Sequence, residues 1–173
     1  MFVTDEPQGT PAGPAGPPPP NPRRFAGRVV MISGVSDQGI GGATAERYAR
    51  EGASLAIGYY GKPPQRLLRK LDRWQVPHAA QECDITDNAQ VQAWVEQCQQ
   101  QFGRLDVLIN NAGIEVAGRF EHFSDADWQR LIDVNLTGAM KLTRAAVPFL
   151  TSPGGVIAGI ASTLALAPCS GFP

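Results

Sequence analysis

A glycine-rich stretch that follows a short apolar run contains the residue types that can hold a phosphate group. Residues 29–32 are apolar, and Gly34, Gly39 and Gly41 come next, ahead of a segment that favours helix. Glycine at such positions permits a tight turn and lets a ligand approach the main chain. The N–H groups at the start of the following helix would attract a pyrophosphate.

The stretch matches the dinucleotide-binding pattern G-x-G-x-x-G only in part. Gly39, Gly41 and Thr44 fill the three glycine positions, so the third glycine is absent. A pattern this short also fits glycines that merely form a tight turn between a strand and a helix. The rest of the chain therefore has to decide between a binding loop and a turn.

Three further features with chemical potential follow other apolar segments. They are Asp84, the run Asn110–Asn111–Ala112–Gly113, and Ser162. The carboxyl ends of parallel strands meet at one edge of a sheet, where ligands bind, so we expect these features and the glycine-rich stretch to form one site. Two alternatives stay open, because Asp84 could cap the next helix and Ser162 could be a simple strand-end hydroxyl.

The spacing of apolar residues predicts five strands that alternate with helices. Short connections between such elements require a parallel sheet that is covered by helices on both faces and built by right-handed crossovers. The fold class is therefore α/β. The expected strands are 29–32, 54–59, 78–83, 105–109 and 156–160, and the expected helices are 40–51, 63–76, 87–102 and 124–150.

The segment 124–150 has the clearest helical pattern in the chain. Ser124 is placed as the N-cap, and an apolar stripe recurs at helical spacing. Asn135 falls on this stripe, so it could be either a core amide or a residue that supports a site. The stripe consists of Trp128, Leu131, Ile132, Leu136, Ala139, Leu142 and Ala146.

Composition and charge exclude several classes of function. The formal net charge is −1 and 18% of the residues are charged, as in ordinary globular domains. The basic residues Arg66, Arg69, Lys70 and Arg73 lie on one expected helix and indicate a solvated face, so we expect no nucleic-acid partner. We also expect no membrane partner and a cytoplasmic location, because the sequence has neither a membrane-length apolar run nor a signal-peptide pattern.

The cysteines do not have the spacing of a disulfide framework or of a zinc site. Cys83, Cys98 and Cys169 are far apart, and His78 and His122 are the only imidazoles. We expect three free thiols and no bound metal.

The N-terminal residues 1–25 are rich in proline and contain little that a core could bury. Such a composition is typical of a disordered or polyproline-like tail. We expect a disordered tail over 1–25 and one nucleotide-binding domain over 26–173.

Over residues 28–173 the chain resembles the short-chain dehydrogenase/reductase family. Asn110–Gly113 is similar to the family's N-N-A-G after the fourth strand, and Asp84 with Ile85 is similar to its adenine-contacting turn. Asn135 resembles its helix asparagine, and Ser162 resembles its substrate-orienting serine. The resemblance implies a three-layer Rossmann-type sheet, incomplete at its C-terminus, and hydride transfer between a nicotinamide cofactor and a carbonyl or secondary alcohol.

The resemblance assigns site residues as follows. The implied catalytic residues are Ser162 and Asn135. The implied cofactor-binding residues are Gly34, Ser36, Gly39, Ile40, Gly41, Tyr59, Lys62, Asp84, Ile85, Asn111, Ala112 and Gly113.

Two departures from the family pattern matter. The first turn carries one residue more between Gly34 and Gly39 than the family's T-G-x-x-x-G-x-G. The family's Y-x-x-x-K pair is not found after Ser162, and a missing general acid–base group typically costs on the order of 10² to 10⁴ in rate. We therefore expect the chain as given to bind cofactor but to turn over little. A non-catalytic dinucleotide-binding or interaction protein is the alternative. The resemblance is compatible with a homo-oligomer in the full-length form but does not determine the oligomeric state.

Cofactor choice in dinucleotide-binding folds is made after the second strand, where an acid binds the ribose diol of NAD. Tyr59 occupies that place here, and Lys62 and Arg66 follow. We predict NADP over NAD, with NAD still possible. The alternative for Gly61–Lys62 is an exposed loop without a role in binding.

Overall fold

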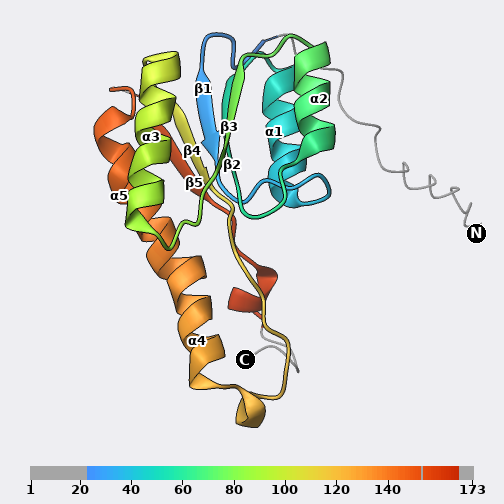
Figure 1. The fold of residues 1–173 in the computed structure, drawn as a ribbon, viewed down its shortest axis with the longest axis vertical. Coiled ribbons are helices and arrows are strands. Elements are labelled where there is room, and N and C mark those ends of the chain that lie inside the picture. The colour runs from blue at the N-terminus through green and yellow to red at the C-terminus, as the bar shows by residue number, and fades with distance from the viewer. Residues whose placement is uncertain (1–22, 153, 168–173) are drawn as a thin grey trace, which may run out of the picture.

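The computed structural model describes residues 23–152 and 154–167 (Figure 1). Most of the predicted tail and Cys169 lie outside these residues. A parallel five-stranded sheet with the order β3-β2-β1-β4-β5 forms the centre. Its strands are β1 (Val29–Ile32), β2 (Ser54–Tyr59), β3 (His78–Glu82), β4 (Val107–Asn110) and β5 (Val156–Gly159).

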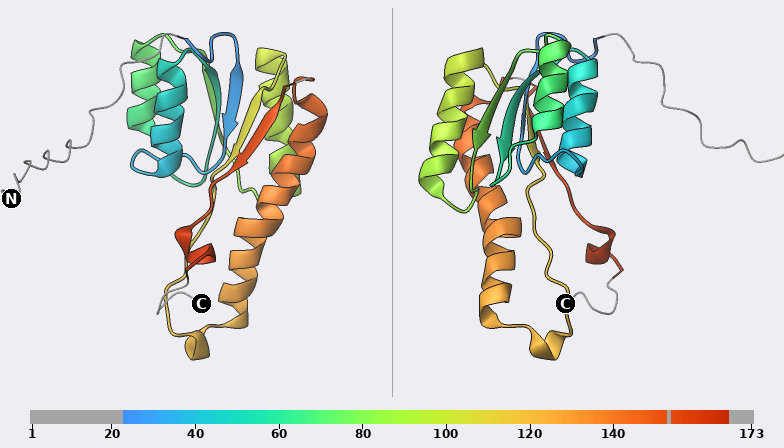
Figure 2. Two further views of the ribbon diagram at one scale, coloured as in Figure 1. Left: turned by 180° about the vertical axis from the view of Figure 1, so that it is seen from behind. Right: turned by 45° about the vertical axis from the view of Figure 1, so that its right-hand side comes forward.

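Helices cover both faces of the sheet, as Figure 2 shows, so the predicted three-layer fold is confirmed. α1 and α2 lie on one face, and α3 and α5 lie on the other (Figure 1). The helices are α1 (Ile40–Arg50), α2 (Gln65–Arg73), α3 (Asn88–Phe102), α4 (Asp125–Ile132) and α5 (Ala139–Ala146), with a π-helical turn at Asp133–Gly138 and 3-10 turns at Phe120–His122, Val147–Phe149 and Thr163–Ala165. None of the described helices is both long and apolar enough to cross a membrane.

The core consists of two layers because successive strand residues point to opposite faces of the sheet. Met31 packs in one cluster with Trp94 of α3 and Leu142 of α5. Its neighbour Ile32 packs in the other cluster with Leu67 of α2. The uninterrupted apolar runs of β1 and β2 are thus explained by burial on both faces.

The long helix of the C-terminal half differs from its predicted packing. Leu142 and Ala146 are buried in α5, but Trp128 and Leu136 are 52% and 64% exposed. The reason is visible in Figure 1, where α4 extends past the end of the sheet and has no layer to pack against. Only the second half of the predicted apolar stripe is therefore core.

Arg24 and Phe25, which the sequence places in the tail, pack against α1. The Phe25 ring meets the Tyr48 ring edge-on at 4.7 Å between centroids. Arg24 and Arg47 both donate to the buried carboxylate of Glu51, and these hydrogen bonds lower its pKa to about 2. The ordered domain accordingly includes these two residues.

The starts of β1 and β4 are joined through the buried carboxylate of Asp106. Its Oδ1 accepts from Arg28 at 2.8 Å and from Arg104 at 2.7 Å. Its Oδ2 accepts from Arg104 Nε at 2.8 Å and from the Val29 amide at 2.9 Å. Burial raises the pKa of this carboxyl, but the hydrogen bonds outweigh burial and hold the pKa well below its usual range.

We predict that Asp106→Asn lowers the free energy of unfolding at pH 7 by about 2 to 3 kcal/mol, because two guanidiniums lose their buried counter-charge. A carboxyl whose pKa is depressed on folding stabilises the fold above its unfolded pKa and loses this effect as the pH falls. The difference in the free energy of unfolding between the wild type and Asp106→Asn should therefore shrink below about pH 4. Urea unfolding from pH 7 to pH 3 measures it.

The carboxyl of Asp72 provides the control for this experiment, since its side chain is 70% exposed and its ion-pair contact is a long one, 3.6 Å from His78 Nε2. Asp72→Asn should change the free energy of unfolding by less than about 1 kcal/mol at any pH in this range. A deficit in Asp106→Asn that stayed constant from pH 7 to pH 3 would contradict the assigned role.

Candidate functional site

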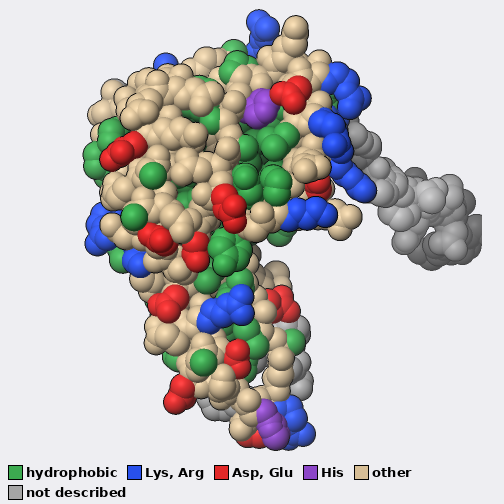
Figure 3. Space-filling model, in the orientation of Figure 1, with side chains coloured by type: hydrophobic (Ala, Val, Ile, Leu, Met, Phe, Trp, Pro, Cys, Tyr) green, Lys and Arg blue, Asp and Glu red, His purple; other side chains and the backbone are tan. Residues whose placement is uncertain are grey.

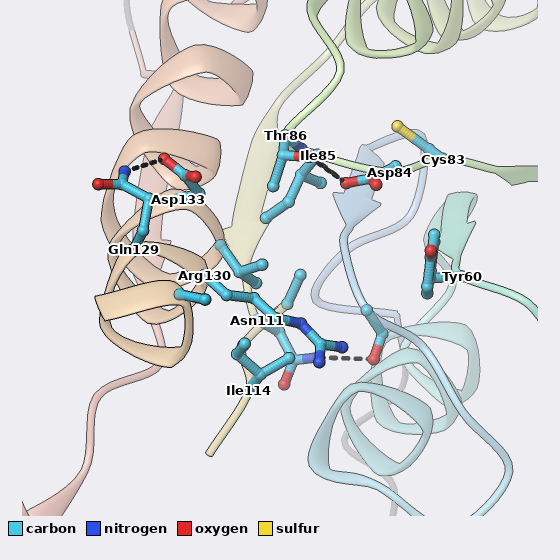
Figure 4. A pocket seen from close by; sticks show the side chains of 15 residues that line it. Tyr60, Cys83, Asp84, Ile85, Thr86, Asn111, Ile114, Gln129, Arg130 and Asp133 are labelled. Carbon is cyan, nitrogen blue, oxygen red and sulfur yellow. Dashed lines mark hydrogen bonds between the residues drawn. The ribbon is translucent and has the colours of Figure 1, made fainter. Parts of the chain in front are cut away.

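A cavity of about 610 Å³ opens at the carboxyl edge of the sheet, between the strand ends and the face of α4 (Figure 4). Segments that follow β1, β2, β3 and β4 all contribute to it, as the topology predicts. Its lining residues are Gly34, Tyr60, Cys83, Asp84, Ile85, Thr86, Asn111, Ala112, Gly113, Ile114, Ala126, Gln129, Arg130, Asp133 and Val134.

The loops after β1 and β4 are locked together beside this cavity. The buried Ser33 hydroxyl accepts hydrogen bonds from the Asn111 amide at 3.1 Å and from the Ala112 amide at 3.0 Å. In return, Asn111 Nδ2 donates to the carbonyl oxygens of Ser33 at 2.8 Å and of Gly34 at 3.0 Å. Gly34 has φ +65°, and a Cβ there would lie 2.5 Å from Ala112 Cα, so only glycine fits.

The contact between the loops after β1 and β4 forms a junction, and the start of α1 faces it. No side chain caps this helix start. Gly39 is the N-cap, and its own amide donates to Ser36 Oγ at 3.0 Å. A Cβ on Gly41 would lie 2.5 Å from Asn111 Nδ2, so the helix can approach the junction only because this residue is glycine. The uncapped N–H groups and the helix dipole make this helix end able to bind an anion. Ile40, the first helical residue, is 63% exposed.

Asp84 does not cap the next helix, which removes one of the alternatives for this residue. Asp87 is the cap of α3, and its carboxylate accepts from the amides of Ala89 and Gln90. Asp84 instead forms a local turn in which its Oδ1 accepts from the amide and hydroxyl of Thr86, both at 2.8 Å. Its carboxylate lies on the cavity wall (Figure 4).

The two neighbouring asparagines at the end of β4 have different contacts. Asn110 donates to Thr143 Oγ1 of α5 at 2.8 Å and so anchors the strand end to a helix layer. Asn111 points to the β1 loop, as described above. Of the two, only Asn111 belongs to the cavity wall.

Asn135 lies in the π-helical turn and holds the backbone that follows Gly113. Its Oδ1 accepts from the Ile114 amide at 2.8 Å, and its Nδ2 donates to the Ile114 carbonyl at 2.9 Å. π-Helical turns occur frequently at functional sites. Asn135 is exposed, so the alternative of a core amide does not apply.

Several residues predicted from the sequence lie outside the cavity lining. Tyr59 ends β2 with a partly buried side chain, and Lys62 is exposed in the turn that follows. Ser162 lies beyond β5, where its Oγ accepts from the Leu164 amide at 3.2 Å. Of the predicted site residues, Gly34, Asp84, Ile85, Asn111, Ala112 and Gly113 line the cavity.

Sequence reasoning missed the wall that α4 contributes. Ala126, Gln129, Arg130 and Asp133 have the spacing of one helix face, and this face is turned to the cavity. Helical periodicity could have identified this polar face opposite the apolar stripe. Arg130 is the single Lys or Arg among the lining residues.

The described cysteines, Cys83 and Cys98, are free and buried. Burial raises the pKa of the Cys83 thiol to about 11, so this cavity residue stays protonated near neutral pH. Among the residues that the structure describes, no group of three or more His, Cys, Asp or Glu side chains could hold a metal ion.

Comparison with known proteins finds dehydrogenases and reductases. A family model described as short chain dehydrogenase matches residues 28–173. A (5R,7aS)-5-hydroxy-7a-methyl-1-oxo-2,3,5,6,7,7a-hexahydro-1H-indene-carboxyl-CoA reductase of Mycobacterium tuberculosis is 38% identical over 146 residues, which are 80% of this chain and 54% of the relative. A meso-2,3-butanediol dehydrogenase of Serratia marcescens is 32% identical over 83% of this chain and 56% of the relative.

Solved structures agree with these relatives. A short chain dehydrogenase from Burkholderia cenocepacia J2315, in complex with NADP, has a TM-score of 0.81 and 30% identity over 87% of this chain and 61% of that chain. This chain spans about half the length of the curated relatives it matches. From the matched residues, the parallel sheet and the junction at its carboxyl edge, the chain belongs to the short-chain dehydrogenase/reductase family.

Proposed function

We propose that this chain supplies the cofactor-binding part of an NADP-dependent oxidoreductase, which transfers hydride between nicotinamide and a carbonyl or secondary alcohol. The proposal rests on the contact between the loops after β1 and β4. This contact leaves the uncapped start of α1 beside the cavity, and the carboxylate of Asp84 lies on the cavity wall. An anionic dinucleotide needs these features together.

The residues present fit such a cofactor. The uncapped start of α1, with Gly39 and Gly41, would bind the pyrophosphate, and Ser36 would keep the loop in shape. Asp84 and Ile85 would hold the adenine, while Asn111 to Gly113 would line the path toward the nicotinamide. When bound, the cofactor supplies the hydride or accepts it.

Asn135 and Ser162 are the residues of this chain proposed for the chemical end of the site. Asn135 would act by positioning, since it holds both polar backbone atoms of Ile114. Ser162 would hold the substrate oxygen, because its hydroxyl proton is still available while its oxygen accepts from Leu164. Ser162 follows β5, and Ile114, which Asn135 holds, follows β4.

Proton transfer needs a further group. The sequence has three tyrosines, Tyr48, Tyr59 and Tyr60, all of which precede β3. Ser162 follows β5, which lies at the other side of the sheet from β2. We therefore expect these 173 residues to bind the cofactor but to turn over little.

Two observations support NADP as the cofactor. The end of β2 presents Tyr59 and Tyr60 in place of an acid. Lys62 is exposed two residues after Tyr60, and Lys and Arg side chains gather over the neighbouring α2 (Figure 3). A 2′-phosphate would meet positive charge there.

We predict that Lys62→Glu weakens NADPH binding about ten-fold more than NADH binding, because only NADPH carries the 2′-phosphate. Titration of both cofactors against the purified chain, followed by cofactor fluorescence, measures the two dissociation constants. Arg119→Glu, which makes the same charge change at an exposed residue distant from β2, should weaken neither. Equal losses for both cofactors in Lys62→Glu would refute the role of Lys62.

We predict that Ser33→Ala lowers the free energy of unfolding by about 2 kcal/mol, because the amides of Asn111 and Ala112 lose a buried acceptor. Affinity for NADPH and for NADH should fall by equal factors, since the junction serves both. Ser33→Thr keeps the hydroxyl and should retain binding. Urea unfolding and cofactor titration test this, and an Ala variant with wild-type stability would overturn it.

A further inference from the structure

Asp37 lies in the glycine-rich loop that precedes α1, but its side chain caps the start of α2. Its Oδ1 accepts from the Leu67 amide at 2.9 Å, and its Oδ2 accepts from the Arg66 amide at 3.1 Å. Both amides belong to the first turn of α2, whose own N-cap residue, Pro64, offers no side-chain hydrogen bond. The loop after β1 thus supplies the cap that α2 lacks.

The loop after β1 is held in place on both sides of Asp37. Val35 is buried, and its amide donates to the Gly58 carbonyl of β2 at 2.9 Å, which fixes the loop at its start. The end of the loop is fixed by a hydrogen bond from the Gly39 amide to Ser36 Oγ. Asp37 lies between Val35 and Gly39, and from there its carboxylate reaches the first turn of α2.

The capping carboxylate changes the charge at the α2 start. The N-terminus of a helix favours an anion, and here Asp37 already occupies it. Arg66 and Arg69 lie near enough to stabilise the charged form of Asp37. Although burial acts in the opposite direction, the two amides and these guanidiniums lower the pKa of Asp37, so the carboxylate is ionised at neutral pH.

The topology places the 2′ position of a bound cofactor close to this carboxylate. The pyrophosphate site follows β1 and the adenine site follows β3, and β2 lies between these two strands. The adenosine ribose must therefore cross the end of β2, directly beside the start of α2 and the loop that carries Asp37.

We propose that Asp37 is a specificity-determining residue, which lowers the affinity of the site for the 2′-phosphate by occupying the N-terminus of α2 with a negative charge. This inference rests on the proposed cofactor-binding function. Lys62 and Arg66 favour NADPH, and Asp37 opposes them, so the chain accepts NADH as well. Asp37 takes the part that an acid at the end of β2 plays in NAD-binding folds.

The test compares the ratio of NADH to NADPH dissociation constants among variants of the full 173-residue chain. Asp37→Asn and Asp37→Ser both remove the charge and keep a side chain that can cap a helix. Each should raise the ratio of the NADH to the NADPH dissociation constant by about two- to five-fold, because removing one charge at a helix terminus has an effect of this size. Asp72→Asn makes the same charge change on α2, away from the loop, and should leave the ratio unchanged.

The outcomes are distinguishable. If both Asp37 variants lose affinity for the two cofactors by equal factors, Asp37 is only a structural cap and the proposal is wrong. If Asp72→Asn shifts the ratio as far as Asp37→Asn does, the effect is one of net charge and the proposal is also wrong. A wild-type chain that binds neither cofactor defeats the proposed function itself, whatever the variants do.

Discussion

The structure of the site depends on one close approach of two backbones, between the loops that follow β1 and β4. Gly34 lies so near Ala112 that no side chain fits, and its positive φ turns the chain toward α1. Ser33 and Asn111 then bind across the gap. Because β1 and β4 are neighbours in the sheet, this contact fixes the start of α1 relative to one wall of the cavity.

Polar side chains near the cavity bind backbone atoms of the loops that surround it. Asn135 holds Ile114, and Gln90 accepts from the Asp84 amide at 2.9 Å. Gly138 approaches Ile85 so closely that a Cβ would lie 2.7 Å from that side chain. The π-helical turn, the β3–α3 turn and the loop after β4 are therefore positioned by one another rather than by the sheet alone.

Four carboxylates of the domain lie in two different environments. Asp106 and Glu51 are buried and are compensated by arginines, so their charges serve the fold. Asp84 and Asp37 lie at the carboxyl edge of the sheet, where Asp84 accepts from the nearby Thr86 amide and Asp37 accepts from the Leu67 amide of α2. A buried charge needs full compensation, whereas a charge at the cavity edge can also act on a ligand.

The sequence by itself determined the alternation of strands and helices and the residues at the strand ends. Apolar runs and glycine turns are local signals, so these patterns alone place Gly34, Asp84 and Asn111 at one edge of the sheet. They could not determine that α4 passes beyond the sheet and exposes Trp128, since periodicity does not show what a helix packs against. The partners of Ser33, Asn135 and Asp37 likewise emerged only from the tertiary structure, because hydrogen bonds between distant segments depend on how close the fold brings them.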